Sequence, residues 1–293
     1  MHKTVLSGIL LTSLAYFLFT VQDASVKWLV AALPVLQILF VRSVTIFAIC
    51  LAIGRAPLAR RALVSPVMKP MILRNLLLLS AWLCYYTAAR DLGLAELTTL
   101  YYASPVIMTL LAVPMLGEVV SVGRWLAVIT GFIGVVVACN VIGTGMAVSL
   151  PVCLALLAAT FWAISSVLLR KTALQETTLT QMLISSGFFI LFTGAAMPFV
   201  WTALAFPDLL LMAATGVLAG MAQYALFEGM RRTEVSVLAP FEYSSLIWAF
   251  VLGFAIWGDV PAGHVAAGAL LIFTAGFIVL YAERASGRRR LGI

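Results

Sequence analysis

Long apolar runs, each of about 20 residues, follow one another along almost the whole chain. A helix of that length is long enough to cross the ~30 Å hydrocarbon core of a lipid bilayer. Because only 10% of the residues are charged, too few remain to cover the surface of a water-soluble protein of 293 residues. We therefore predict an all-α integral membrane protein. Its ten transmembrane helices are expected at residues 5–26, 34–53, 70–89, 97–116, 124–142, 148–168, 179–200, 208–229, 235–256 and 263–282.

Lysine and arginine residues are unevenly distributed between the segments that connect these runs. With the N-terminus inside, fifteen of them fall in cytoplasmic segments, whereas only Lys27 and Arg90 fall in outer segments. Such a bias sets the orientation of membrane proteins, so both termini are predicted to face the cytoplasm. The cytoplasmic set is Lys3, Arg55, Arg60, Arg61, Lys69, Arg74, Arg124, Arg170, Lys171, Arg231, Arg232, Arg284, Arg288, Arg289 and Arg290.

The two halves of the chain resemble each other weakly, at offsets of 138 to 144 residues. Each half contains five predicted spans, an odd number, so the two repeats must cross the membrane in opposite orientations. Inverted repeats are typical of secondary transporters. We predict one repeat over residues 1–146, a second over 147–283, and a basic cytoplasmic tail over 284–293. Matching positions are Phe17 and Phe161, Lys27 and Lys171, Gln37 and Gln181, Tyr86 and Tyr224, Glu96 and Glu234, and Leu116–Glu118 and Trp257–Asp259.

Two stretches carry a specific pattern, SPVIMTLLAVPMLGE at Ser104–Glu118 and APFEYSSLIWAFVLGFAIWGD at Ala239–Asp259. They resemble the repeat signature of the EamA-type transporters of the drug/metabolite transporter superfamily, and Gln22–Ser43 resembles the first two helices of those proteins. The resemblance implies a ten-helix transporter of small metabolites, among which bacterial amino-acid exporters are prominent. Two positions depart from the family pattern, because Ala127 stands where glycine is usual and Asp259 replaces the usual glutamate. Neither departure threatens the fold.

Three charged residues, Asp23, Arg42 and Glu242, lie within or at the edge of the predicted spans. A charge inside a bilayer is costly, which makes each a candidate for function. At ~1.5 Å per residue, Arg42 lies about 12 Å and Glu242 about 10 Å from the ends of their helices, whereas Asp23 is close to the outer surface. Arg42 and Glu242 are predicted to line a cavity for a zwitterion, whose carboxylate and ammonium they would bind. Alternatively they pair with each other or with Asp23 and only hold helices together.

Aromatic residues several positions inside the spans are candidates for lining such a cavity, although Trp and Tyr also gather at membrane interfaces. Gln37 and Gln181 are repeat-related amides, for which substrate contact and hydrogen bonding between helices are both open. Pro105 and Pro240 remove backbone donors within two spans and are candidates for gating or hinge positions. The aromatic candidates are Tyr86, Tyr101, Trp162, Tyr224, Tyr243 and Trp248.

These features favour a secondary active or facilitative transporter that works by alternating access through a central cavity between the repeats. The resemblance favours export of amino acids, aromatic ones included, across a bacterial inner membrane. An alternative cargo is a nucleoside-like or cofactor solute such as S-adenosylmethionine or riboflavin, and an alternative class is a membrane enzyme or a non-transporting sensor. An enzyme is not expected, because no catalytic cluster is evident in the chain.

The expected partners are a small-molecule substrate and the lipid bilayer. The chain shows no motif for a metal or a cofactor, and its basic residues form no surface typical of nucleic-acid binding. The sequence leaves open the exact substrate, the direction of transport, the coupling ion, the resting conformation and the oligomeric state, a monomer included.

Overall fold

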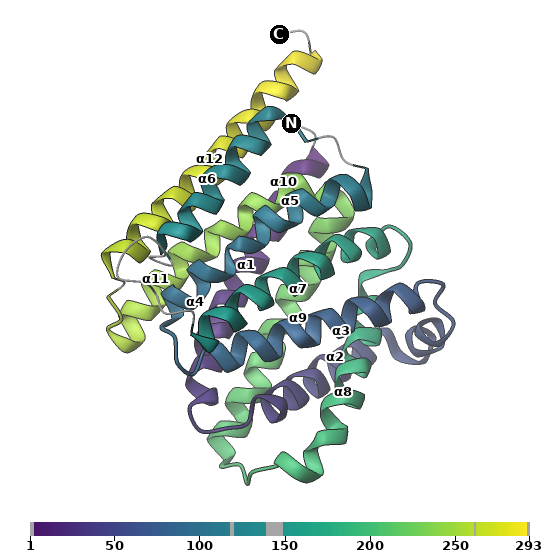
Figure 1. Cartoon of the computed structure of the whole chain (residues 1–293). Helices are drawn as coiled ribbons and strands as arrows, with labels where there is room; N and C mark the ends of the chain where they lie inside the picture. Colours follow the sequence, from purple (N-terminus) through teal and green to yellow (C-terminus); the bar gives the residue numbers. More distant parts are fainter. Residues whose placement is uncertain (1–2, 118–119, 139–148, 261, 292–293) are drawn as a thin grey trace.

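A computed structural model describes residues 3–117, 120–138, 149–260 and 262–291, and within these ranges the chain forms helices and loops without a strand (Figure 1). The prediction of an all-α protein is confirmed. The elements are α1 (Lys3–Val30), α2 (Val35–Leu63), α3 (Met68–Ala88), α4 (Leu94–Tyr101), α5 (Ala103–Leu116), α6 (Val122–Ala138), α7 (Leu150–Ala173), α8 (Thr178–Val200), α9 (Phe206–Arg232), α10 (Val235–Leu238), the 3-10 helix η1 (Ala239–Tyr243), α11 (Ser244–Trp257) and α12 (Gly263–Leu291).

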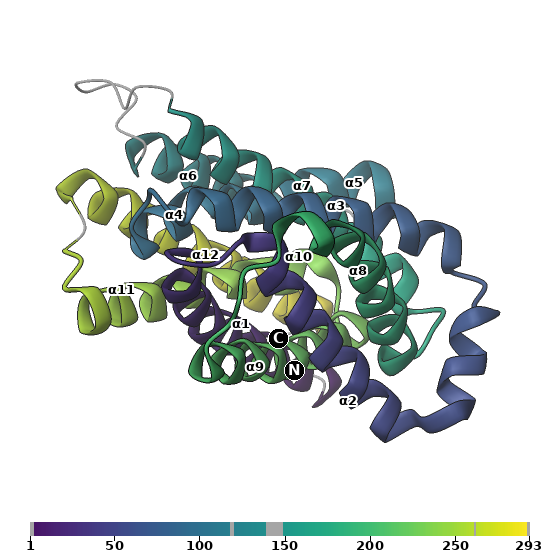
Figure 2. The same ribbon diagram turned by 90° about the horizontal axis from the view of Figure 1, so that it is seen from below.

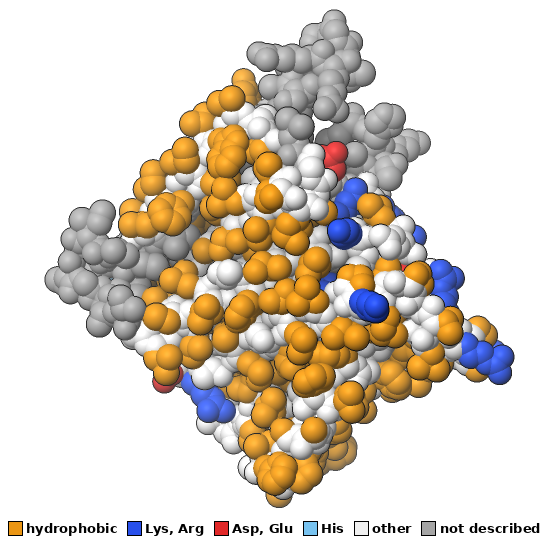
Figure 3. Space-filling view, turned by 45° about the vertical axis from the view of Figure 1, so that its right-hand side comes forward, with side chains coloured by type: hydrophobic (Ala, Val, Ile, Leu, Met, Phe, Trp, Pro, Cys, Tyr) orange, Lys and Arg blue, Asp and Glu red, His pale blue; other side chains and the backbone are white. Residues whose placement is uncertain are grey.

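Seven helical segments of the described chain are long and apolar enough to cross a membrane, and three shorter apolar helices accompany them. Figure 3 shows apolar side chains over most of one face, with most of the visible lysine and arginine side chains towards its right-hand edge. An apolar surface of this extent suits contact with lipid. The seven segments are Leu6–Val30, Val35–Leu63, Met68–Ala88, Leu97–Leu116, Leu150–Ala173, Thr178–Val200 and Phe206–Arg232. The total of ten spans stays a prediction.

The helices pack in pairs that join the two halves of the chain: α1 with α9, α3 with α7, α2 with α8, and α6 with α12 (Figures 1 and 2). Glycine allows the closest of these approaches. A Cβ atom added at Gly229 of α9 would lie 2.4 Å from Oγ1 of Thr12 on α1. One added at Gly8 of α1 would lie 2.3 Å from Oγ1 of Thr233. The α1–α9 contact therefore depends on these two positions having no side chain.

The repeated LGE and WGD motifs mark two equivalent helix ends. Helix α5 ends at Gly117 with φ 70°, and α11 ends at Gly258 with φ 69°. Glycine is favoured in this left-handed conformation because it has no Cβ. The amide of Gly117 donates to the carbonyl of Val113, and that of Gly258 to the carbonyl of Phe254. Glu118, the last residue of the first motif, lies outside the described residues.

Two of the predicted spans are broken. The span expected at 97–116 is divided into α4 and α5 at Tyr102, and the one expected at 235–256 is divided into α10, η1 and α11. Proline accounts for both interruptions, because Pro105 cannot donate to the carbonyl of Tyr101 and Pro240 cannot donate to that of Ser236. The side chain of Pro240 lies outside the described part of the structure. The breaks bring α5 against η1.

Ion pairs connect loops and helix ends from the two halves. Arg61 Nε lies 2.8 Å from Oε1 of Glu176, and Ser65 donates to the other oxygen at 3.1 Å. Burial raises the pKa of Glu176, but hydrogen bonds from the Thr177 amide, Ser65 and Arg61 outweigh burial and hold this pKa below its ordinary value. A second pair joins Lys27 to a residue after α11, Asp259, at 3.6 Å.

Candidate functional site

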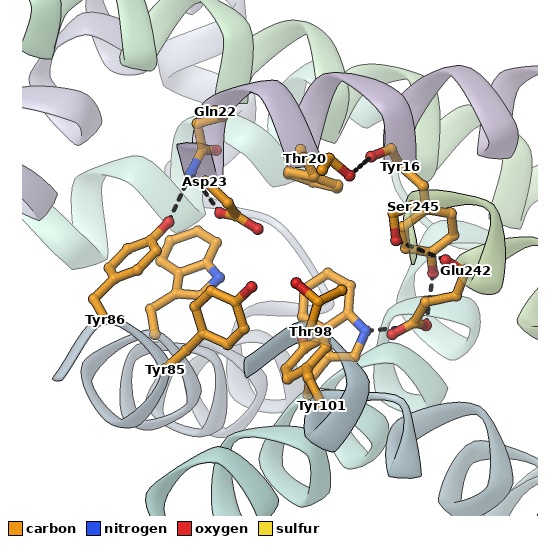
Figure 4. A pocket seen from close by; sticks show the side chains of 13 residues that line it. Tyr16, Thr20, Gln22, Asp23, Tyr85, Tyr86, Thr98, Tyr101, Glu242 and Ser245 are labelled. Atoms are coloured by element: carbon orange, nitrogen blue, oxygen red, sulfur yellow. Dashed lines mark hydrogen bonds between the residues drawn. The ribbon is translucent and has the colours of Figure 1, made fainter. Parts of the chain in front are cut away.

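An internal cavity of about 60 Å³ lies where α1, α3, α4 and α7 meet the broken segment η1–α11 (Figure 4). Its wall combines aromatic rings, hydroxyl groups and two carboxylates, a composition typical of a site for a small organic solute. The lining residues are Tyr16, Phe19, Thr20, Gln22, Asp23, Trp82, Tyr85, Tyr86, Thr98, Tyr101, Trp162, Glu242 and Ser245.

Glu242 is buried at this cavity, and both of its carboxylate oxygens accept hydrogen bonds. The Tyr16 hydroxyl donates to Oε2 at 2.9 Å and the Ser104 hydroxyl to Oε1 at 2.6 Å. Trp162 Nε1 also donates to Oε2, at 3.4 Å. Ser104 and Glu242 are separated by 138 residues, so this bond joins the broken segments of the two halves of the chain.

Asp23 lies across the cavity from Glu242 (Figure 4). Its Oδ1 is 3.3 Å from Nε2 of Gln22, and the same amide donates to the Tyr86 hydroxyl at 2.7 Å. The sequence analysis placed Asp23 close to the outer end of its helix. Helix α1 continues to Val30, four residues beyond the predicted end at residue 26, so that Asp23 lies inside the protein wall rather than at its rim.

Arg42 lies behind the cavity wall rather than in it. Its Nη1 donates to the Tyr86 hydroxyl at 2.8 Å, and its guanidinium carbon lies 3.5 Å from the centre of the Trp82 ring. Among the described residues, its Nε and Nη2 have no hydrogen-bond partner, and no ion pair within 4.0 Å joins Arg42 to Asp23 or Glu242. Arg42 therefore contacts two residues of the wall, Tyr86 and Trp82, and does not itself line the cavity.

The titratable side chains of the cavity wall are acidic. Asp23 and Glu242 line the cavity, and no lysine, arginine or histidine is among the described residues of its wall. A buried carboxylate is stable only when hydrogen bonds and a cation or a proton compensate its charge. Aromatic rings also attract cations. Across the described ranges, no group of three or more His, Cys, Asp or Glu side chains is placed to hold a metal ion. The arrangement suits an organic cation.

The other aromatic candidates divide into two groups. Tyr86, Tyr101 and Trp162 line the cavity. Tyr224 and Trp248 lie at the surface instead, with exposed fractions of 46% and 39%. The side chain of Tyr243 lies outside the described part of the structure.

The side-chain amides of Gln37 and Gln181 form hydrogen bonds with loop residues. Gln37 accepts from the Thr202 amide at 3.1 Å and from its hydroxyl at 2.9 Å, and donates to its carbonyl at 2.8 Å. Gln181 accepts from Thr172 at 2.9 Å and donates to the carbonyl of Glu176 at 3.3 Å. Neither amide lines the cavity. Pro105 lies in the first turn of α5, next to Ser104.

Several residues of the wall were not predicted from the sequence, namely Tyr16, Phe19, Thr20, Gln22, Thr98 and Ser245. Tyr16, Phe19, Thr20 and Asp23 follow the spacing i, i+3, i+4, i+7, which places them on one face of α1. A mixed aromatic and polar stripe within an apolar span is the signal that could have identified this face. A similar stripe on α3 consists of Trp82, Tyr85 and Tyr86, and one on α4 consists of Thr98 and Tyr101.

Replacing Gln37 by leucine is expected to destabilise the protein without changing transport per folded molecule. The substitution removes the bonds to Thr202 and costs about 1–3 kcal/mol, since a backbone donor loses its partner. Thermal unfolding in detergent measures the loss. Gln175→Leu, at an exposed glutamine, is the matched control. An unchanged melting temperature combined with weaker solute binding would show that Gln37 contacts the solute.

The model of the EamA-like transporter family matches the chain twice, over residues 6–139 and 149–281. Among relatives of known activity, the chain is similar to the pseudopaline exporter CntI of Pseudomonas aeruginosa, with 27% identity over 92% of this chain and 94% of that protein. It is 28% identical to a riboflavin transporter of Vibrio cholerae, over 71% and 69% of the two chains. An S-adenosylmethionine uptake transporter of Rickettsia prowazekii is 23% identical over 97% and 96%.

A solved crystal structure has the same fold. It superposes with a TM-score of 0.73 at 21% identity, over 96% of this chain and 98% of the other. At this identity the likeness concerns the arrangement of the helices alone.

Proposed function

Since the chain belongs to the EamA-like transporter family of the drug/metabolite transporter superfamily, we propose that it moves small organic solutes that carry a cationic group across a bacterial inner membrane. Amino acids, aromatic ones included, are the first candidates, and export is the proposed direction. The chain is a multi-pass membrane protein of a small-molecule transporter family, and its relatives are named as transporters.

One observation carries this proposal: Asp23 and Glu242 line the same cavity, and no basic side chain is among the described residues of the wall. The three donors to Glu242 stabilise its carboxylate but do not neutralise it. An ammonium group of the solute supplies the missing charge, and the rings around it provide apolar contact. The solute's carboxylate, if it has one, lies away from the two acidic side chains.

The proposed mechanism is alternating access between two inverted five-helix repeats, with both termini in the cytoplasm. When each helix is replaced by its counterpart in the other half, the pair α1–α9 becomes the pair α7–α3. The pairs α2–α8 and α6–α12 remain the same pairs. This pattern of contacts supports a two-fold relation between the halves. The breaks at Tyr102 and at Ala239–Tyr243 fall at related positions as well. Pockets for drug-sized ligands measure about 300–1,000 Å³. A cavity of about 60 Å³ must therefore widen to admit a solute.

A second candidate cargo is a nucleoside-like or cofactor solute. The relatives named for S-adenosylmethionine and riboflavin favour it, as does the aromatic wall. S-adenosylmethionine is itself a cation and fits the acidic cavity, whereas riboflavin has no cationic group.

Counterflow into proteoliposomes tests the function. Vesicles preloaded with unlabelled solute are given the labelled form, for a panel of amino acids, S-adenosylmethionine and riboflavin. We expect exchange of cationic or zwitterionic solutes at rates well above those of protein-free vesicles. Exchange of riboflavin alone would keep the transport function and overturn the cationic cargo, and no exchange of any solute would contradict the proposed transport.

A further inference from the structure

Arg74 on α3 is buried in the protein interior, with 2% of its surface exposed. The sequence placed it among the basic residues of a cytoplasmic segment, and the structure shows that its side chain is not exposed to water there. Helix α3 begins at Met68, so Arg74 lies about 9 Å along it at ~1.5 Å per residue. Its packing against α7, α8 and α9 removes it from water.

The Arg74 guanidinium has few partners among the described residues. Its Nη1 donates to the Ser185 hydroxyl at a long 3.4 Å, and its Nε has no hydrogen-bond partner in the described chain. The guanidinium lies 4.7 Å from the centre of the Phe227 ring. No carboxylate of the described residues lies within 4.0 Å of it. Arginine has five N–H donors, and a buried cation without an anion is costly. The arrangement calls for an anionic ligand.

A second, smaller cavity of about 10 Å³ adjoins Arg74, and it too must widen to admit a carboxylate. Ser165, Ser166 and Gln223 add polar groups to its wall. Gln223 is buried, and it lines this cavity together with Arg74. Polar groups of this kind, set around a guanidinium, suit a carboxylate, which arginine binds with two parallel hydrogen bonds.

The two cavities share one wall. Phe19, Trp82 and Trp162 line both of them, and the Phe19 and Trp162 rings pack edge to face with centroids 6.2 Å apart. Along α3, Arg74 and Tyr85 are eleven residues apart, or about 16 Å. The acidic cavity therefore lies on one side of this aromatic layer and the guanidinium on the other.

We propose that the Arg74 cavity is a second binding station, which takes the carboxylate of a solute that crosses the aromatic layer. This inference rests on the proposed transport function and extends it. The solute's cationic group is bound between Asp23 and Glu242, and its carboxylate meets Arg74 at the next stage of the path. The end of α3 that carries Arg74 adjoins the exposed Lys69, in the segment that is predicted to be cytoplasmic, so the second station lies on the cytoplasmic side.

Binding of acetate to purified protein in detergent tests the station without any transport step. Acetate supplies a carboxylate, and acetamide of the same shape, with sodium chloride added to match the salt, is the neutral comparison. At concentrations about ten times its dissociation constant, acetate is expected to raise the melting temperature by about 2–4 °C more than acetamide. The difference should vanish in Arg74→Met and persist in Lys69→Met, the exposed cation on the same helix.

Two results would overturn the station: equal shifts with acetate and acetamide, or an undiminished acetate shift in Arg74→Met. Should Arg74→Met fail to fold, Gln223→Leu and Arg74→Lys take its place. The first is expected to reduce the acetate shift and the second to retain part of it, and an unchanged shift in Gln223→Leu would contradict the proposal. The rise in melting temperature with acetate should also be seen in Glu242→Gln. A protein that binds acetate but transports no solute would refute the proposed function without refuting the second binding station.

Discussion

Glu242→Gln is expected to lower the rate of solute counterflow about a hundredfold, the largest effect of any conservative change in this chain. Glutamine keeps the size of the side chain but removes the negative charge that compensates a cationic solute. Its amide nitrogen would also face a donor, because Tyr16, Ser104 and Trp162 all donate to the carboxylate. Initial rates in proteoliposomes, divided by the amount of folded protein, measure the loss.

The matched control for this variant is Glu234→Gln, at an exposed glutamate in the connection between α9 and α10. Its transport rate should equal that of the parent protein. Melting temperatures of both variants separate a functional loss from misfolding. If Glu242→Gln transports as fast as the parent protein, Glu242 has no part in recognising the solute.

Asp23→Asn is expected to weaken solute binding about tenfold, less than the change at Glu242. Asp23 is partly exposed, and the hydrogen bond that it accepts from Gln22 is long, at 3.3 Å, so its carboxylate is held less firmly in place than that of Glu242. The dependence of the counterflow rate on solute concentration gives the affinity. Asp91→Asn, at an exposed aspartate just after α3, should leave the affinity unchanged. Equal affinities for Asp23→Asn and the parent protein would leave Glu242 as the sole acidic contact.

The class of the fold could be predicted from the sequence because it depends on composition and period. A run of about 20 apolar residues has few alternatives to a membrane helix. The LGE and WGD motifs indicated a repeat, and the structure adds that Gly117 and Gly258 follow two helices in the left-handed conformation that favours glycine. The breaks in two helices were predicted in part. Pro105 and Pro240 indicated where the helices are interrupted, but not that separate helices form on either side.

The site was predicted less well, because side-chain environment depends on tertiary packing. Tyr86 and Tyr224 occupy matching positions of the repeats, yet their exposed fractions are 2% and 46%. Helix α3 turns Tyr86 towards the cavity, whereas Tyr224 on α9 faces outward. Similar sequence positions thus have different surroundings in the two halves. Asp23 was predicted to lie close to the outer surface because the end of α1 was taken as the end of its apolar run, whereas the helix continues beyond it.

The buried arginines show the same limit. Arg42 was predicted to bind the solute directly, and the structure places Tyr86 between it and the cavity. Arg74 was assigned to a cytoplasmic segment because charge usually marks the end of a span. Only the packing of α3 against other helices shows that its guanidinium is inside.

The central claim is that the cavity between Asp23 and Glu242 binds the cationic group of a transported solute. Counterflow of a transported amine, compared with its N-acetylated form, tests it most directly, because acetylation removes the positive charge and leaves the rest of the molecule intact. We predict that the acetylated form is exchanged at least about tenfold more slowly by the parent protein, and that Glu242→Gln largely abolishes this preference. Equal exchange of the two forms by the parent protein would contradict the claim.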